Sequence, residues 1–254
     1  MLRKVAVCAV AVLGSAALNV VPATAIVGGS PAAAQTASYQ VSVRMEGWKG
    51  KSHVCGGFLL SANKVITAAH CVDGATASKL EVQWGGLDRN KLPQTSPVAK
   101  ISVPPSYDYG TLANDVAVVT LAKSASETGG VKYARLATSE PAAGANVTVT
   151  GWGRTQRNSA SLPTRLQTAK LPVLSRQSCA AAYSEPGAAF DTTGRFCAGP
   201  ADGSRAICNG DAGGPAAING AVVGIISGGS GCGETDSLSL FSSVSYFKSW
   251  LESQ

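Results

Sequence analysis

Apolar and polar residues alternate in short runs along most of this chain. Between residues 39 and 45, for example, every second residue is apolar. A period of two is typical of half-buried strands, and Gly, Pro, Ser and Asn separate the runs. Comparable apolar runs cover residues 54–60, 80–84, 98–103, 116–121, 147–152, 166–174 and 221–226. The pattern predicts an all-β fold with mostly antiparallel strands.

Only the end of the chain shows the period of a helix. Val244, Phe247, Trp250 and Leu251 fall on one stripe when the segment is wound as a helix. We therefore expect a terminal helix over about 243–253, docked through its aromatic side chains.

The first 25 residues have the pattern of a secretory signal. Arg3 and Lys4 precede an apolar segment over 5–21, and Ala23-Thr24-Ala25 supplies a small-x-small cleavage pattern. We interpret 1–25 as a removed signal peptide, so the mature protein is expected to be secreted and to begin at Ile26. No later stretch reaches the roughly 20 apolar residues that a membrane span needs, so no membrane partner is expected.

Composition narrows the class of protein. With 45% hydrophobic and 14% charged residues among 254, the chain is neither disordered nor a coiled coil. Its formal net charge of +6 includes two basic residues of the predicted signal. The remaining excess is spread thinly and forms no block of like charges, so nucleic acid is not expected as a partner.

Cysteine usage indicates disulfides. One of the seven cysteines, Cys8, lies in the predicted signal. The other six are Cys55, Cys71, Cys179, Cys197, Cys208 and Cys232. An even number in a secreted chain, with no C-x-x-C spacing, favours three disulfides over a zinc site. Spacing alone leaves their pairing open.

Two other segments carry organisational signals. Residues 123–144, rich in Ala, Ser, Gly and Glu, are the best candidate for a crossover between two halves of about six strands each. Asn146 begins the only glycosylation sequon, Asn146-Val147-Thr148. It is either a glycosylation site or a chance match.

Five motifs then occur in a fixed order. They are Ile26-Val27-Gly28-Gly29, Thr67-Ala68-Ala69-His70-Cys71, Asn114-Asp115-Val116-Ala117-Val118-Val119, Thr150-Gly151-Trp152-Gly153 and Cys208-Asn209-Gly210-Asp211-Ala212-Gly213-Gly214-Pro215. From Ile26 to the terminal helix, the chain resembles the chymotrypsin and trypsin family of serine proteases, especially its compact microbial trypsins.

The resemblance implies an architecture for residues 26–254. It consists of two perpendicular six-stranded antiparallel β-barrels, over about 26–135 and about 136–242, with a cleft between them and the terminal helix behind. It also implies one cysteine pairing: Cys55 with Cys71, Cys179 with Cys197, and Cys208 with Cys232. The last bridge would tie together the walls of the specificity pocket.

The resemblance also assigns roles to individual residues. His70 matches the general base, and Asp115 matches the carboxylate that orients it. An acid directly before the apolar run 116–119 is desolvated, which is costly unless the acid is paired. The amides of Gly210 and Ala212 match the oxyanion hole. His53, the other histidine, is expected to make a structural hydrogen bond.

The new ammonium group of Ile26 is expected to fold inward and pair with Asp211, as in activated family members. This ion pair would order the 210–214 loop and keep the oxyanion hole in shape. The predicted site therefore keeps its shape but is not reactive.

The chain departs from the family pattern inside the cleft. Ala212 stands between Asp211 and Gly213, where the family has its nucleophilic serine, and a methyl group cannot attack a carbonyl. Three specificity positions have changed too. Ala206 replaces the acid of trypsins, Ser227-Gly228-Gly229 replaces a Ser-Trp-Gly wall, and Ser239 replaces a glycine.

Two functional hypotheses follow. The first is a secreted, monomeric serine protease homologue that is not an enzyme and acts by binding another protein. It would be comparable to the glucanase inhibitor proteins of oomycetes, effectors that bind host hydrolases such as an endoglucanase. The alternative is a secreted serine endopeptidase in which Ala replaces Ser in this sequence, with small or apolar residues before the cut bond.

Neither hypothesis involves a cofactor or metal. Two histidines do not make a zinc site, and no close carboxylate pair suggests a carbohydrate hydrolase.

Overall fold

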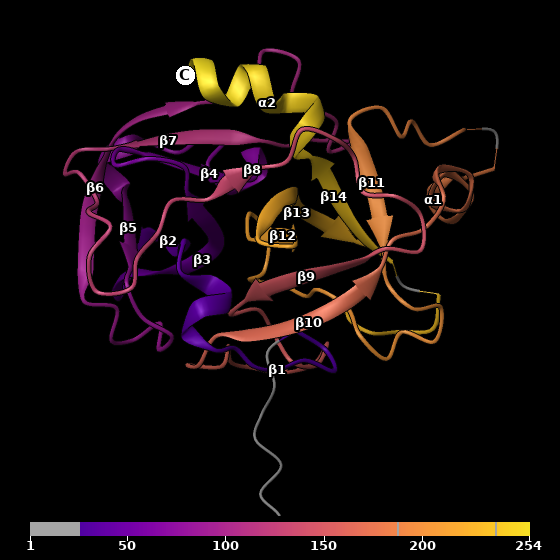
Figure 1. Ribbon diagram of the computed structural model, residues 1–254, viewed down its shortest axis with the longest axis horizontal. Helices are drawn as coiled ribbons and strands as arrows, with labels where there is room; N and C mark the ends of the chain where they lie inside the picture. Colours follow the sequence, from indigo (N-terminus) through magenta and orange to yellow (C-terminus); the bar gives the residue numbers. More distant parts are fainter. Residues whose placement is uncertain (1–25, 187, 237) are drawn as a thin grey trace, which may run out of the picture.

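The computed structural model describes residues 26–186, 188–236 and 238–254. The predicted signal peptide, 1–25, lies outside the described residues, and so does the cleavage that would release Ile26. The described chain folds into two β units that lie next to each other, with a helix across one end (Figure 1). The expected mostly β architecture with a terminal helix is confirmed.

The first unit is a closed antiparallel barrel of six strands. Its strands, in their order around the barrel, are β2 (Gln40–Gly47), β3 (Gly50–Leu59), β4 (Lys64–Thr67), β7 (Ala117–Leu121), β6 (Gln94–Ser102) and β5 (Leu80–Trp84). Successive side chains of a strand point to opposite faces, which explains which residues fill the barrel. In β5, Leu80, Val82 and Trp84 are buried, while Glu81 and Gln83 between them are partly exposed.

The second unit is an eight-stranded sheet. Its main strands are β10 (Gln167–Pro172), β9 (Asn146–Gly151), β12 (Pro215–Ile218), β13 (Ala221–Gly229), β14 (Ser239–Ser243) and β11 (Arg195–Ala198), in this spatial order. Two dipeptide strands extend it: β1 (Ser30–Pro31) pairs with β10, and β8 (Arg135–Leu136) pairs in parallel with β13.

The first and last main strands of this sheet are β10 and β11. One isolated bridge joins these two ends, and no ladder of paired residues connects them in the described chain. Val173 pairs with Ala198, and the Leu174 amide donates to the Cys197 carbonyl at 2.9 Å. Pro172 at the end of β10 has no N–H to donate and only accepts, from the Gly199 amide at 2.9 Å. The predicted second barrel is thus a six-strand ring whose closure is a single bridge.

Two α-helices complete the described chain. The sequence pattern did not predict α1 (Arg176–Tyr183), which begins where the Ser175 hydroxyl accepts from the Ser178 amide. It did predict α2 (Val244–Ser253), whose Val244, Phe247 and Leu251 are buried. Neither of these described helices is long and apolar enough to cross a membrane.

The C-terminal helix holds the two units together. One buried cluster contains Phe58 and Ile66 of the first unit, Val222 and Ile225 of the second, and Phe247 of α2. Separate apolar clusters fill the interior of each unit. Because the joint between the units is itself a hydrophobic core, residues from both can be held in fixed positions across the cleft.

All three expected disulfides are present. They join Cys55 to Cys71, Cys179 to Cys197, and Cys208 to Cys232. Each closes a loop of fewer than about 30 residues, and such a bridge typically adds about 3 kcal/mol by restricting the unfolded chain. Three disulfides fit a protein of an oxidising, extracellular compartment.

Candidate active site

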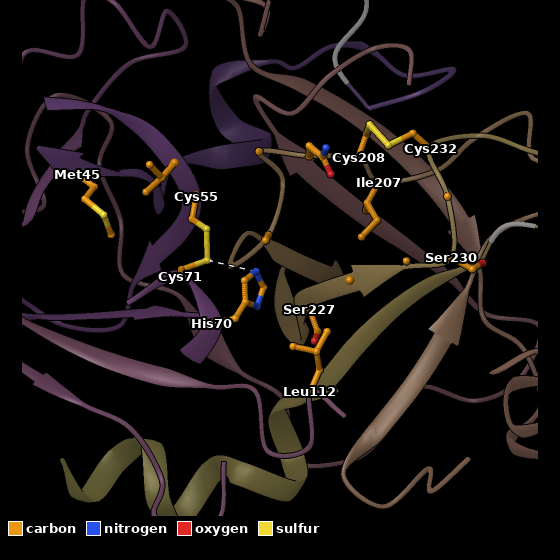
Figure 2. A pocket seen from close by; sticks show the side chains of 17 residues that line it. Met45, Cys55, His70, Cys71, Leu112, Ile207, Cys208, Ser227, Ser230 and Cys232 are labelled. Atoms are coloured by element: carbon orange, nitrogen blue, oxygen red, sulfur yellow. Dashed lines mark hydrogen bonds between the residues drawn. A yellow bond between two sulfur atoms is a disulfide. The ribbon is translucent and has the colours of Figure 1, made fainter. Parts of the chain in front are cut away.

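A cleft of about 630 Å³ lies between the two units and is lined by both. The first unit contributes Met45, Val54, Cys55, His70, Cys71 and Leu112, and the second contributes residues 207–210, 212 and 227–232. In Figure 2 the side chains of His70, Ser227, Leu112 and Ile207 surround this space. The lining includes no Asp or Glu among the described residues, and this absence bears on the substrate.

His70 and Asp115 form a tightly held pair. His70 lies in a short 3-10 turn, Ala69–Cys71, directly after β4, and the Cys55–Cys71 disulfide ties this turn to β3. Asp115 lies just before β7 and is fully buried. Its Oδ2 is 2.8 Å from His70 Nδ1, and its Oδ1 accepts from the His70 backbone amide at 2.9 Å. Because the carboxylate accepts, Nδ1 carries the proton and Nε2 keeps its lone pair.

Two serines of the second unit also hold Asp115. Ser227 Oγ donates to Asp115 Oδ2 at 2.6 Å, and Ser242 Oγ donates to the Asp115 backbone carbonyl at 2.8 Å. The sequence assigned Ser227 only to the specificity wall and gave Ser242 no role. They come from β13 and β14, more than a hundred positions along the chain, so no local pattern could reveal their contacts with Asp115.

The loop that carries Ala212 is fixed between the two units. The Ala212 carbonyl accepts from the Gly56 amide at 2.8 Å, and the Gly213 amide donates to Ile226 at 2.7 Å. A β-carbon on Gly213, whose φ is +79°, would lie 2.1 Å from Thr67 Oγ1. Only glycine fits there, so this neighbour fixes the backbone that aims the position 212 side chain into the cleft lined by His70.

Gly210 and Ala212 both line the cleft, and within the described residues their backbone amides have no acceptor. Gly210 has φ of +98°, which turns the peptide in a way that L side chains rarely adopt. Two free neighbouring amides can bind a negatively charged oxygen, as an oxyanion hole requires.

His53 supports the same loop through a structural hydrogen bond, in line with the sequence expectation. Its Nε2 is 2.9 Å from the Gly210 carbonyl, and its Nδ1 is 2.8 Å from Ser42 Oγ. A carbonyl only accepts, so Nε2 is protonated and Ser42 donates to Nδ1. Burial lowers the pKa of His53 to about 4, so the ring is neutral at physiological pH.

This neutral histidine predicts a pH-dependent loss of stability. The unfolded chain takes up a proton at His53 below about pH 6.5, whereas the folded chain does so only near pH 4. Stability is therefore lost as the pH falls through this window. In His53→Gln the side-chain amide can still donate to the Gly210 carbonyl, but residue 53 no longer takes up a proton in this pH range. Urea unfolding at pH 7 and 4.5 should show about 2 kcal/mol less acid destabilisation for the variant, and parallel losses in both proteins would contradict this role.

Asp211 is a buried carboxylate enclosed by backbone. It accepts from the Gly153 amide at 2.7 Å and from the Cys208 amide at 2.9 Å. β-Carbons on Gly151 or Gly153 would lie 2.0 and 2.3 Å from Asp211 atoms, which explains the two glycines of the Thr-Gly-Trp-Gly motif. Burial raises the pKa of Asp211 to about 7, although both amide hydrogen bonds lower it.

The segment after the predicted cleavage point is already inserted in the second unit. Ile26 is fully buried, and Val27 forms a bridge with Ala206, with the Val27 amide 2.9 Å from the Ala206 carbonyl. The Ile26 nitrogen is a peptide amide in the uncleaved chain, so its ion pair with Asp211 stays a prediction for the mature protein. Such a pair would supply the positive charge that the buried Asp211 carboxylate lacks.

The structure places the predicted specificity residues in two groups. Gly228 and Gly229 line the cleft, whereas Ala206 and Ser239 are buried and lie outside its lining. Ser239 Oγ accepts from the Ile207 amide at 3.2 Å. The cleft is lined instead by Ile207, which the sequence reasoning missed because it compared only the positions at which trypsins carry a recognised residue.

Two other predicted features can be located. Asn146 is exposed at the start of β9, and its modification stays a prediction. Ligand atoms of Cys55, His70 and Cys71 approach within 4.8 Å of one another. Both sulfurs belong to one disulfide and offer no thiolate, so this group is not a metal site.

The two β units with a histidine–aspartate pair and two free amides in the cleft define the class of serine-protease-like proteins. The trypsin family model matches residues 26–251, and the chain belongs to the trypsin family.

Several named trypsins are similar to this chain over most of its length. Trypsin Blo t 3 of Blomia tropicalis is 37% identical over 231 residues, which cover 89% of this chain and 85% of the relative. Trypsin-3 of Salmo salar and trypsin of Sus scrofa are each 35% identical, covering 90% and 89% of this chain and 92% and 94% of their own lengths. These relatives come from animals, so the microbial type remains a prediction.

These comparisons overturn one expectation from the sequence. The prediction that the chain is not an enzyme is wrong, because relatives at 32–37% identity are named trypsins and point to an active serine protease family. The error came from giving one position decisive weight. Ala212 determines whether an acyl intermediate can form there, but the family and the named relatives are those of serine proteases.

Proposed function

We propose that this protein is a secreted serine endopeptidase whose nucleophilic serine is replaced by Ala212 in this sequence, so that the chain cuts peptides only once Ala212→Ser restores the hydroxyl. The observation that carries the proposal is the assembled His70–Asp115 pair, with Nδ1 and Oδ2 2.8 Å apart, beside an oxyanion loop with two free amides. These groups are the parts that peptide hydrolysis needs besides the hydroxyl.

The proposed reaction is acyl transfer. With a serine at position 212, its Oγ attacks the peptide carbonyl while His70 Nε2 takes the hydroxyl proton. Asp115 stabilises the resulting imidazolium without accepting the proton, and the amides of residues 210 and 212 bind the oxyanion. His70 then protonates the leaving amine, and water releases the acyl group by the same route.

The proposed substrates carry a small or apolar residue before the cut bond. Within the described lining of the cleft no carboxylate is available to pair with a Lys or Arg side chain. Ile207 instead presents an aliphatic side chain there. A buried cation without a partner is disfavoured by several kcal/mol, whereas a small apolar side chain loses only contact with water.

A mixed peptide library tests this preference. The Ala212→Ser variant should cut after Ala, Val or Leu at least about tenfold faster than after Lys or Arg, which corresponds to about 1.4 kcal/mol. Mass spectrometry of the products identifies the cut bonds. Cleavage mainly after Lys or Arg would contradict the assigned pocket while leaving the protease activity in place.

A further inference from the structure

Arg195, at the start of β11, is a buried cation that lacks an ion-pair partner. Only 5% of the residue is exposed, and no salt bridge within the described residues includes it. Its guanidinium lies 4.9 Å from the centre of the Phe190 ring, and its Nε has no hydrogen-bond partner. Burying a charge without an ion-pair partner costs free energy, so other contacts of this guanidinium have to offset that cost.

Within the described part of the chain, this guanidinium donates one hydrogen bond, and it reaches the other unit. Nη1 donates to the backbone carbonyl of Thr111 at 3.0 Å. Thr111 belongs to the loop between β6 and β7 of the first barrel, whereas β11 belongs to the second unit. The bond therefore connects the two units next to the cleft. Burial lowers the pKa of Arg195, and the carboxylates of Asp191, Asp115 and Asp108 oppose this shift by favouring the charged guanidinium.

The loop that Arg195 contacts, residues 108–114, has an unusual backbone. Asp108 Oδ1 accepts from the amide and hydroxyl of Thr111, at 2.7 and 2.8 Å. Leu112 and Asn114 have φ of +52° and +56°, in the left-handed region that non-glycine residues rarely adopt. Such conformations persist only where the surroundings hold them. The hydrogen bond from Arg195 to the Thr111 carbonyl restrains the backbone directly beside Leu112.

Leu112 in turn forms part of the cleft wall. It lines the cleft, and a β-carbon added to Gly228 would lie 3.3 Å from Leu112 Cδ1. Gly228 stands where the related proteases carry the aromatic residue of their Ser-Trp-Gly wall. Because Gly228 has no side chain, Leu112 lies against the bare backbone of β13 and provides the apolar surface there (Figure 2).

We propose that Arg195 is a positioning residue that fixes the 108–114 loop to the second unit and thereby sets the Leu112 wall against which a bound peptide lies. The inference rests on the proposed function, because it takes the cleft as a peptide site. Arg195 itself does not line the cleft and acts only through the loop.

Hydrogen exchange on the unmodified protein is the first test. Arg195→Met keeps the length of the side chain and leaves only the carbonyl of the exposed Thr111 without its partner, so the variant is expected to fold. Exchange of the 109–113 amides should be at least about tenfold faster than in the unmodified chain. Arg176→Met is the matched control, since Arg176 is a neighbouring arginine that bonds to Thr192 and Glu140 and not to this loop. Equal exchange in both variants would overturn the proposal.

Kinetics in the Ala212→Ser background are the second test. Arg195→Met should raise KM for the best-cleaved library peptide about tenfold and change kcat less than about twofold, because Ser227 and His70 hold Asp115 independently. Arg195→Lys, which keeps a donor, should restore part of the loss.

A double-mutant cycle with Leu112→Ala separates positioning from a general structural effect. If Arg195 acts through Leu112, Arg195→Met should raise KM less than about threefold once Leu112 is truncated. A full tenfold effect in that background would overturn the proposal. If the Ala212→Ser variant cleaves no peptide, the proposed function fails, and the exchange measurement still decides whether Arg195 fixes the loop.

Discussion

Ala212→Ser should raise peptide turnover by about a million-fold, the loss that removal of the nucleophile causes in a serine protease. The serine adds one oxygen beside the His70–Asp115 pair and the unbonded amides of Gly210 and Ala212, and the experiment uses the mature protein in which Ile26 is expected to pair with Asp211. The Gly56 amide and the Ile226 carbonyl hold the peptide group between residues 212 and 213, so the new hydroxyl enters the cleft without a change of fold. Turnover of a fluorogenic peptide with Ala before the cut bond measures the gain.

Two comparisons make this result decisive. The unmodified chain is the matched control, because it differs only by one oxygen. Adding His70→Ala to Ala212→Ser should return turnover to about the level of the unmodified chain, since residues of a catalytic unit act together. An Ala212→Ser protein with unchanged circular dichroism and intact disulfides but no cleavage would contradict the assignment.

Asp115→Asn in the Ala212→Ser background should lower kcat about 10⁴-fold. The Asp115 carboxylate accepts from His70 Nδ1, from the His70 amide and from Ser227 Oγ. An amide cannot accept all three and favours the wrong tautomer of the histidine, which costs about this factor in proteases of this kind. The pre-steady-state acylation rate measures the effect at the chemical step.

Asp108→Asn is the control for this variant. Asp108 is an exposed carboxylate in the loop preceding Asp115, and it bonds to Thr111 and not to His70. Its replacement should change kcat less than about threefold. If both variants lost activity equally, Asp115 would be acting through the loop and not through the histidine.

Much of this fold could be predicted from the sequence because its strands obey a simple period. The runs at 80–84 and 147–152 match β5 and β9 within a residue, since half-buried strands alternate regardless of their partners. Two of the strands that escaped prediction have other compositions. β12 begins with Pro215 and continues with two alanines, and β14 consists largely of serines, so neither shows an apolar alternation.

Part of the candidate site could likewise be predicted from the sequence, and part could not. His70, Asp115 and the 208–215 loop lie in local motifs, so their identity could be predicted before their geometry. Ser227, Ser242 and Arg195 act through contacts with residues more than eighty positions away, and nothing adjacent to them indicates those partners. Ile207 escaped because it belongs to the apolar core of the second unit and also lines the cleft, and this double contact depends on how its loop lies against Val27 and Ser239.

The central claim is that this site is assembled and lacks only a hydroxyl oxygen. Intact mass spectrometry after treatment with a fluorophosphonate tests it directly, because the probe reacts with a serine only where a base and an oxyanion hole activate it. We expect one adduct per molecule on residue 212 of the Ala212→Ser variant and none on the unmodified chain. A correctly folded Ala212→Ser variant that remains unlabelled would contradict the account.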